Sequence, residues 1–260
     1  MNHSDLSSTV THLNRVRPSS RAKLANSDLT RALLLSAERL LDETFSVGRP
    51  TGEDSGFPGF LSRPRVVARA AQDFPRTEPT EAKFRDRWVA HHDFLRDVVG
   101  FTSWNAQHRL RTAMDKALAQ VVRDTLSLHD ASALMSTVWC DTCLGLPSTR
   151  LRLLTAASLG SPDTEPVSGT GQVEVLRETL ARLCQAEGIP SAPDNALTTA
   201  AEVLSVLSDG LAVKTYLGQA QDNAREFGIV LSGIVKALGH GASELTEFPL
   251  SGSIWPSTHR

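Results

Sequence analysis

Basic and aromatic side chains alternate over six residues of the sequence, in a pattern with the chemistry of a nucleic-acid contact. The five residues are Lys83, Phe84, Arg85, Arg87 and Trp88. Lysine and arginine bind phosphate oxygens and the edges of guanine bases. Phe84 and Trp88 are four residues apart, so on a helix they share one face, which we expect to point inward. Acidic residues are interleaved with the cations, so an ordinary solvated helix face is an equally good interpretation.

A second pattern, Trp139-Cys140-Asp141-Thr142-Cys143, has the spacing of a reactive thiol pair. Such a pair at a helix N-terminus has a lowered thiol pKa and exchanges disulfides, but it requires a buried strand before the motif. Residues 127–138 instead have a helical pattern. A zinc site needs about four ligands, and the remaining candidates, Cys184 and scattered histidines, do not supply them at the usual spacing. We therefore expect Cys140 and Cys143 to pack in a core or line a pocket, with no bound metal.

Motifs of the common catalytic and nucleotide-binding sites do not occur in the sequence. There is no glycine-rich dinucleotide fingerprint, phosphate-binding loop, nucleophile elbow or His-Glu-x-x-His zinc motif. The carboxylates of residues 52–58 fall in a Gly/Pro-rich segment that is best interpreted as a solvated connector. The sequence thus predicts a protein that is not an enzyme and has no cofactor.

The composition is that of an ordinary globular protein. The 260 residues are 40% hydrophobic and 22% charged, with a net charge of −2, so a polyanionic or polycationic partner is not demanded. The three cysteines indicate a reducing compartment. No uninterrupted apolar run approaches the roughly 18 residues of a membrane span, and residues 1–27 lack the apolar core of a secretory signal. We expect a soluble cytoplasmic protein that does not contact membranes.

Hydrophobic residues recur with the 3.6-residue period of helices, and valine-rich runs with a period of two are absent. The sequence therefore predicts an all-α fold. Residues 1–26 are interpreted as a flexible tail, 27–100 as one helical domain, 101–242 as a second, and 243–260 as a C-terminal tail. The expected helices, in chain order, cover residues 29–47, 64–72, 80–90, 92–101, 103–122, 130–144, 148–159, 170–187, 195–217 and 221–239, with a loop at 48–64.

Four segments resemble the N-terminal domain of the TetR family of transcriptional regulators: residues 29–47, 66–71, 82–88 and 94–99. The segment 207–218 (LSDGLAVKTYLG) also resembles a helix in the ligand-binding and dimerisation domain of that family. The sequence departs from the family pattern in the turn, where Gln72 replaces a glycine and DFPRTE lengthens the connection. Arg85 and His91 replace the family's phosphate-contacting tyrosine and the lysine that begins the fourth helix.

The resemblance implies a three-helix helix-turn-helix domain followed by a helical bundle that binds ligand and dimerises. It implies a homodimer whose helices 195–217 and 221–239 form a four-helix bundle, a double-stranded DNA operator as partner, and a small-molecule effector that releases the DNA. The DNA-binding residues would be Arg65, Thr80, Lys83, Arg85, Arg87 and His91. The effector pocket would be lined by Trp104, Met114, Trp139, Cys140 and Cys143.

Two alternatives remain open from the sequence. The first is an all-α dimeric interaction or ligand-binding protein that has lost sequence-specific DNA binding; the longer turn and the acidic residues Glu78, Glu81 and Asp86 support it. The second is a thiol oxidoreductase centred on Cys140 and Cys143. The salt dependence of DNA affinity and a dithiol-dependent reduction assay would distinguish them.

Overall fold

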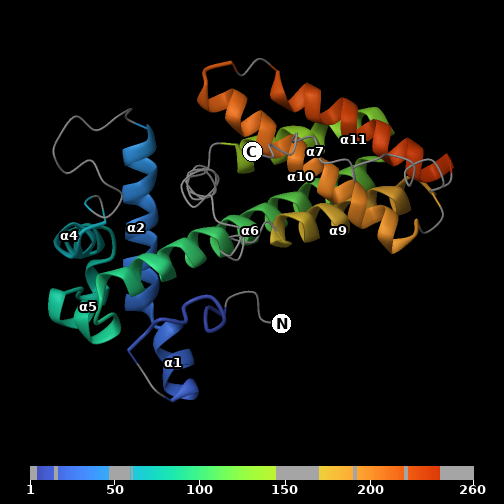
Figure 1. Cartoon of the computed structure of the whole chain (residues 1–260). Helices are drawn as coiled ribbons and strands as arrows, with labels where there is room; N and C mark the ends of the chain where they lie inside the picture. Colours follow the sequence, from blue (N-terminus) through green and yellow to red (C-terminus); the bar gives the residue numbers. More distant parts are fainter. Residues whose placement is uncertain are drawn as a thin grey trace, which may run out of the picture. The chain divides into compact units, whose positions relative to one another are not determined.

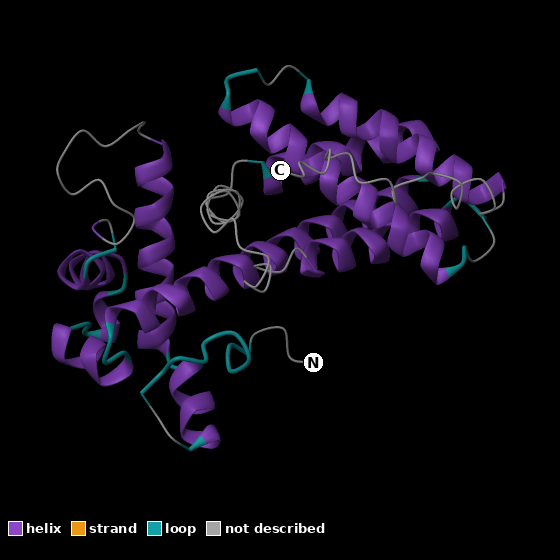
Figure 2. Ribbon diagram, in the orientation of Figure 1, coloured by secondary structure: helices purple, strands orange, loops and turns teal. Residues whose placement is uncertain are grey.

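The computed structural model describes residues 5–14, 17–46, 59, 61–144, 170–189, 192–219 and 222–240. All regular structure in these ranges is helical (Figure 1 and Figure 2), which confirms the all-α prediction. The expected helix at 148–159, the C-terminal tail at 243–260 and most of the loop at 48–64 lie outside these ranges. The described chain divides into two compact units, one ending at His108 and one beginning at Arg109.

From α2 onward the described helices follow the predicted order, with one difference at the middle of the chain. The first unit contains α1 (Pro18–Ala25), α2 (Asp28–Ser46), α4 (Arg63–Asp73), the 3-10 turn η1 (Pro75–Thr77), α5 (Glu81–Arg87) and the first part of α6 (His91–Asp124). The second unit contains the rest of α6, α7 (Leu128–Cys143), α9 (Thr170–Ala186), α10 (Asp194–Tyr216) and α11 (Asn223–His240). The helices expected at 92–101 and 103–122 are thus one continuous helix, so the units divide within α6 and not at residue 100.

Gly100 lies inside α6 and makes room for a contact between this helix and the N-terminal segment. A methyl group at this position would lie 3.2 Å from the carbonyl oxygen of Thr9. The absence of a side chain therefore lets the N-terminal segment approach the helix closely. A glycine at this place in the sequence is equally typical of a helix end, and only the contact distinguishes the two cases.

The core of the first unit is the apolar face of α2 packed against α4, α5 and α6. Leu33, Ala37 and Leu41 of α2 are fully buried, as their helical spacing predicts. Charged residues connect α2 to α4 at the edge of this core. Asp73 accepts from Arg39 at 2.9 Å and from Arg69 at 2.7 Å, and Arg69 also reaches Glu43 at 2.7 Å.

The prediction of a flexible tail over residues 1–26 is wrong for the described residues 5–14 and 17–26. Leu6, Val10 and Leu13 are buried in the core of the first unit, and residues 18–25 form α1. Asn26 holds the two parts together, since its side chain accepts from the Leu6 N–H at 2.9 Å and donates to Asp5 at 2.6 Å. The isolated apolar residues in a polar segment conceal this packing, because their partners are distant in sequence.

The second unit is a helical bundle in which α7 packs on α11 and α9 packs on α10 (Figure 1). The predicted apolar face of α11 is confirmed: Phe227, Leu231 and Val235 are buried. Gly228 permits a close approach of α7, since a methyl group there would lie 3.1 Å from the Ser136 hydroxyl. The core is therefore built from the helical periodicity that the sequence displays.

Among the described helices, α10 is the one that is long and apolar enough to cross a membrane, over Asp194–Thr215. The mean hydropathy of its most apolar window is 1.4, and half of that window is buried inside the structure. A core helix of a soluble protein has these properties, so the finding is consistent with a soluble protein.

The packed N-terminal segment makes a stability prediction. Leu6→Ala removes a fully buried side chain and should lower the free energy of unfolding by about 2–5 kcal/mol, measured by urea denaturation. Ser19→Ala, at an exposed position of α1, should change it by less than about 0.5 kcal/mol. Equal stabilities of the two variants would show that the segment is not part of the core.

Candidate nucleic-acid interface

Two residues between α4 and α5, Glu78 and Thr80, fix where α5 begins. Thr80 begins α5, because its side-chain oxygen accepts from the Lys83 N–H at 3.2 Å and so satisfies one of the free amides of the first turn. Glu78 has a left-handed backbone with φ 47 at the end of η1. This residue reverses the chain between η1 and α5, so the lengthened connection is a defined turn.

The inner face of α5 is an aromatic cluster. Phe84, Trp88 and Phe94 are fully buried, and their ring centroids are 4.7 to 5.3 Å apart in tilted and edge-to-face arrangements. Such geometries are favourable for aromatic pairs. The prediction that Phe84 and Trp88 point inward is confirmed, and the cluster fixes the orientation of this seven-residue helix.

A buried carboxylate completes the attachment of α5. Asp97 of α6 is fully buried and accepts from the Trp88 indole N–H at 2.8 Å. It also accepts from the backbone N–H groups of Thr11 and His12 at 3.0 and 3.1 Å, and its Oδ1 lies 2.8 Å from His12 Nδ1. The N-terminal segment reaches α5 directly as well, since the Asn14 N–H donates to the Arg87 carbonyl at 2.7 Å. The orientation of α5 therefore depends on residues 11–14.

The outer face of α5 carries cations that are paired with neighbouring glutamates. Lys83 Nζ donates to the Glu78 carbonyl oxygen at 2.9 Å and lies 3.4 Å from its carboxylate. Arg85 lies 3.2 Å from the Glu81 carboxylate, and 61% of its side chain is exposed. Exposed pairs of this kind contribute about 0–1 kcal/mol, so the cations can exchange these partners for phosphate. Arg65 on α4 is also exposed.

Two of the predicted DNA-binding residues do not fit the exposed face. Arg87 is buried; its Nε donates to the Thr30 hydroxyl at 3.1 Å and its Nη1 to the Lys83 carbonyl at 2.8 Å. The prediction for Arg87 is therefore wrong, because this residue is three positions after Phe84 and so shares its inner face. His91 is half-buried, with its ring 5.9 Å from that of Phe94.

The five predicted pocket residues do not form one group. Trp104 belongs to the first unit, where it stacks on Phe101 and His108 at centroid distances of 5.9 and 5.6 Å. Met114, Trp139, Cys140 and Cys143 are buried in the second unit. Trp139 stacks on Phe227 at 5.5 Å and its indole donates to the Ser208 hydroxyl at 3.0 Å. These residues are packed in the helical core.

The two cysteines of the Trp-Cys-x-x-Cys pattern are free and buried in the last turn of α7. A helix C-terminus disfavours a thiolate. Burial, with a smaller contribution from Asp141, raises the pKa of Cys140 to about 11. The geometry is thus opposite to that of a reactive thiol pair. In the part of the chain that the structure describes, no group of three or more His, Cys, Asp or Glu residues could hold a metal ion.

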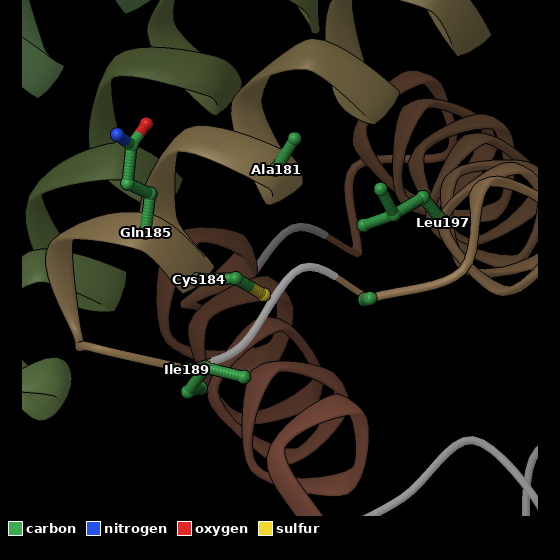
Figure 3. Close-up of a pocket in the computed structure, with 6 residues that line it drawn as sticks. Ala181, Cys184, Gln185, Ile189 and Leu197 are labelled. Carbon is green, nitrogen blue, oxygen red and sulfur yellow. The ribbon is translucent and has the colours of Figure 1, made fainter.

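A hollow that the sequence did not indicate lies between the end of α9 and the beginning of α10 (Figure 3). Its volume is about 340 Å³. Six residues line it: Ala181, Cys184, Gln185, Ile189, Ala192 and Leu197. None of the predicted pocket residues is among them, because the lining residues come from the end of α9, the beginning of α10 and two described positions between these helices, and such a set has no periodic signal.

Asp97 supplies a second stability prediction. Asp97→Asn keeps the size of the side chain but turns an amide N–H₂ toward N–H donors, so one of them loses its acceptor. We expect the free energy of unfolding to fall by about 2–4 kcal/mol, measured by urea denaturation. Asp93→Asn, on the same helix and partly exposed beside His92, is the matched control and should be nearly neutral. A neutral effect of both substitutions would contradict the role given to Asp97.

Comparisons with known proteins returned no match: no family model, no curated protein and no solved structure is similar to the chain. The function must therefore be argued from the residues themselves. Two local features carry the argument. They are the helix α5, with a buried and an exposed side, and the exposed apolar residues of α10 and α11.

Proposed function

We propose that the protein is a DNA-binding transcriptional regulator of the kind that the resemblance to the TetR family implies. In this proposal α4 and α5 form the helix-turn-helix, and α5 is the recognition helix. The observation that carries it is the two-sided character of α5, whose inner face is anchored by Phe84 and Trp88 while Lys83 and Arg85 lie on the outer side. The major groove of DNA, about 12 Å wide, admits a helix presented in this way.

The exposed cations supply the contacts to the DNA backbone. Lys83 and Arg85 leave Glu78 and Glu81 and bind phosphate or guanine, with Arg65 on α4 as a further phosphate contact. Thr80 contributes from the beginning of α5. The glutamates next to the cations lower non-specific attraction, so affinity depends on a site where all of these contacts form together.

A second copy of the chain is the partner that the surface of α10 and α11 best fits. Val206 and Val213 lie on one face of α10, and Leu217 follows at its C-terminal end with the same helical spacing; the three are 73%, 43% and 65% exposed. Ile229 on α11 is 64% exposed. Isolated exposed apolar residues are common, but a row at helical spacing favours an interface.

Two exposed glycines support close helix packing at the proposed interface. Gly210 is exposed between Val206 and Val213, Gly233 is exposed four residues after Ile229, and neither has a neighbour within 4 Å of an added methyl group. Glycine within a helix costs about 1 kcal/mol relative to alanine. That cost is offset where another helix must approach the backbone closely, as in a symmetric dimer.

The proposed dimer presents two copies of α5 to DNA half-sites about one helical turn, or roughly 34 Å, apart. A small-molecule effector that binds better to a dimer with a different spacing shifts the population away from the DNA-bound form. A regulator of this type acts in the cytoplasm, in agreement with the three free thiols that the sequence provides.

A second candidate function is a dimeric ligand-binding protein that does not recognise DNA. The observation that favours it is the acidic character of the outer face of α5. Glu78 and Glu81 each pair with a cation there, and Asp86 is exposed. In this alternative the ion pairs are permanent features of the surface.

The DNA proposal is tested with Lys83→Ala and Arg85→Ala combined. The double variant removes two phosphate contacts per chain, so it should retain a pool of randomised DNA duplexes at least tenfold less well in a gel-retardation assay. The salt dependence of binding should also lose roughly two units of slope per chain. The matched control is Arg123→Ala with Arg225→Ala, two exposed and paired cations of the second unit. If both double variants retain DNA as the unmodified protein does, α5 is not the recognition helix.

The dimer is tested with Val206→Glu and Val213→Glu combined. Two charges on the exposed row of α10 would be buried without partners at the interface, so light scattering should show a monomer of unchanged helical content. Val122→Glu is the control, because Val122 on α6 is 63% exposed and lies outside the row. A protein that is monomeric before any substitution would remove the dimer from the proposal.

A further inference from the structure

The hollow between α9 and α10 has the size of a small-ligand site. Its volume of about 340 Å³ lies in the lower part of the range for ligand pockets, roughly 300–1,000 Å³. An engineered apolar cavity of about 150 Å³ in another protein binds benzene. The hollow therefore accommodates a molecule of about ten to fifteen non-hydrogen atoms.

The lining chemistry selects against charge. Ala181, Ile189, Ala192 and Leu197 are apolar, and no ionised side chain is among the lining residues. Burial raises the pKa of the Cys184 thiol, so it remains neutral at physiological pH and is a poor nucleophile. A charged ligand would lose its hydration without gaining a partner. An uncharged ligand loses much less.

The hollow has two neutral polar groups at different depths. Cys184 is buried, whereas Gln185 is exposed. In Figure 3 Cys184, Ile189 and Leu197 point toward a common space. A ligand of neutral, partly apolar character can fill this space, whereas the Gln185 amide points away from it.

The walls of the hollow belong to a defined part of the bundle. The Ile189 N–H donates to the Cys184 carbonyl at 2.9 Å, and the Gly188 N–H donates to the Gln185 carbonyl at 3.1 Å, so α9 ends in a closed turn. Ile189 also packs on α11, where a methyl group at Gly239 would lie 3.2 Å from its Cδ1. A ligand in the hollow thus contacts α9 and α10 and presses on a residue that α11 supports.

We infer that this hollow is a binding site for a small, uncharged molecule held without a covalent bond. The inference deepens the proposed function, on which its regulatory consequence rests, because it assigns the effector a site and a chemical class. The exposed apolar residues assigned to the dimer lie on α10 and α11. The ligand contacts α10 directly, and it contacts Ile189, which packs on α11. Its occupancy therefore alters the packing of the surface that we assign to the dimer.

The test uses 1-aminonaphthalene, which is uncharged near neutral pH and whose fluorescence changes in apolar surroundings. Titration of the full-length protein should show saturable binding of one molecule per chain. Ala181→Phe fills the hollow from α9 and should weaken this binding at least tenfold. Ala186→Phe places the same side chain on an exposed position of α9 that does not line the hollow, and should bind the probe as the unmodified protein does.

A second filling variant and a charged probe complete the test. Ala192→Phe fills the hollow from the residue two positions before α10 and should also weaken binding at least tenfold. It replaces Ala181→Phe in the test if circular dichroism shows that Ala181→Phe is unfolded. The carboxylate 1-naphthoate, with the same rings and a negative charge, should bind at least tenfold more weakly than the amine. Absence of saturable binding, equal affinity for the two probes, or unchanged affinity in the folded filling variants would overturn the inference.

The failure of this inference is separable from that of the proposed function by measuring DNA retention on the same samples. Retention of DNA without binding of 1-aminonaphthalene overturns the ligand site alone. Binding of 1-aminonaphthalene at the hollow without any DNA retention supports the ligand site and overturns the regulator. Release of DNA on addition of the probe, absent in Ala181→Phe, supports both.

Discussion

The buried carboxylate of Asp97 is the interaction on which the first unit depends. A charge without access to water must be satisfied by donors, and the donors of Asp97 come from places far apart in sequence: Trp88 after α5 and residues 11–12 of the N-terminal segment. One side chain of α6 therefore holds both the end of the candidate recognition helix and the segment that covers it. The N-terminal segment is consequently a structural part of the candidate interface.

As a result, the inner face of α5 is fixed in place while the side chains of its outer face can change partners. The inner face is held by aromatic packing, by Asp97 and by the buried guanidinium of Arg87 on Thr30. On the outer face, Lys83 and Arg85 are paired with Glu78 and Glu81 in exposed ion pairs, which cost little to exchange. A helix of seven residues has little stability of its own, so its orientation has to come from the inner contacts while its binding chemistry stays on the outside.

The second unit distributes its apolar surface differently. Its core residues follow the helical period and are buried, whereas Val206, Val213 and Leu217 follow the same period on the opposite side of α10 and remain exposed. A helix that is apolar on two sides needs two partners, and within the unit only one side is covered. The hollow beside Cys184 lies where α9 ends and α10 begins. A change in the packing of the hollow therefore acts on α10, the helix that carries the exposed row.

The sequence by itself determined the all-α class, the order of most of the described helices, and the inward position of Phe84 and Trp88. Each of these follows from local periodicity, which is visible within a few turns of a helix. Even the burial of Arg87 could have been found this way, from its position three residues after Phe84. Only the tertiary structure decided that Leu6, Val10 and Leu13 are core residues, that α6 continues without a break between residues 101 and 103, and that the hollow lies beside Cys184 instead of Trp139. The physical reason is that these features depend on contacts between residues distant in the chain, and such contacts leave no periodic trace in the segments that make them.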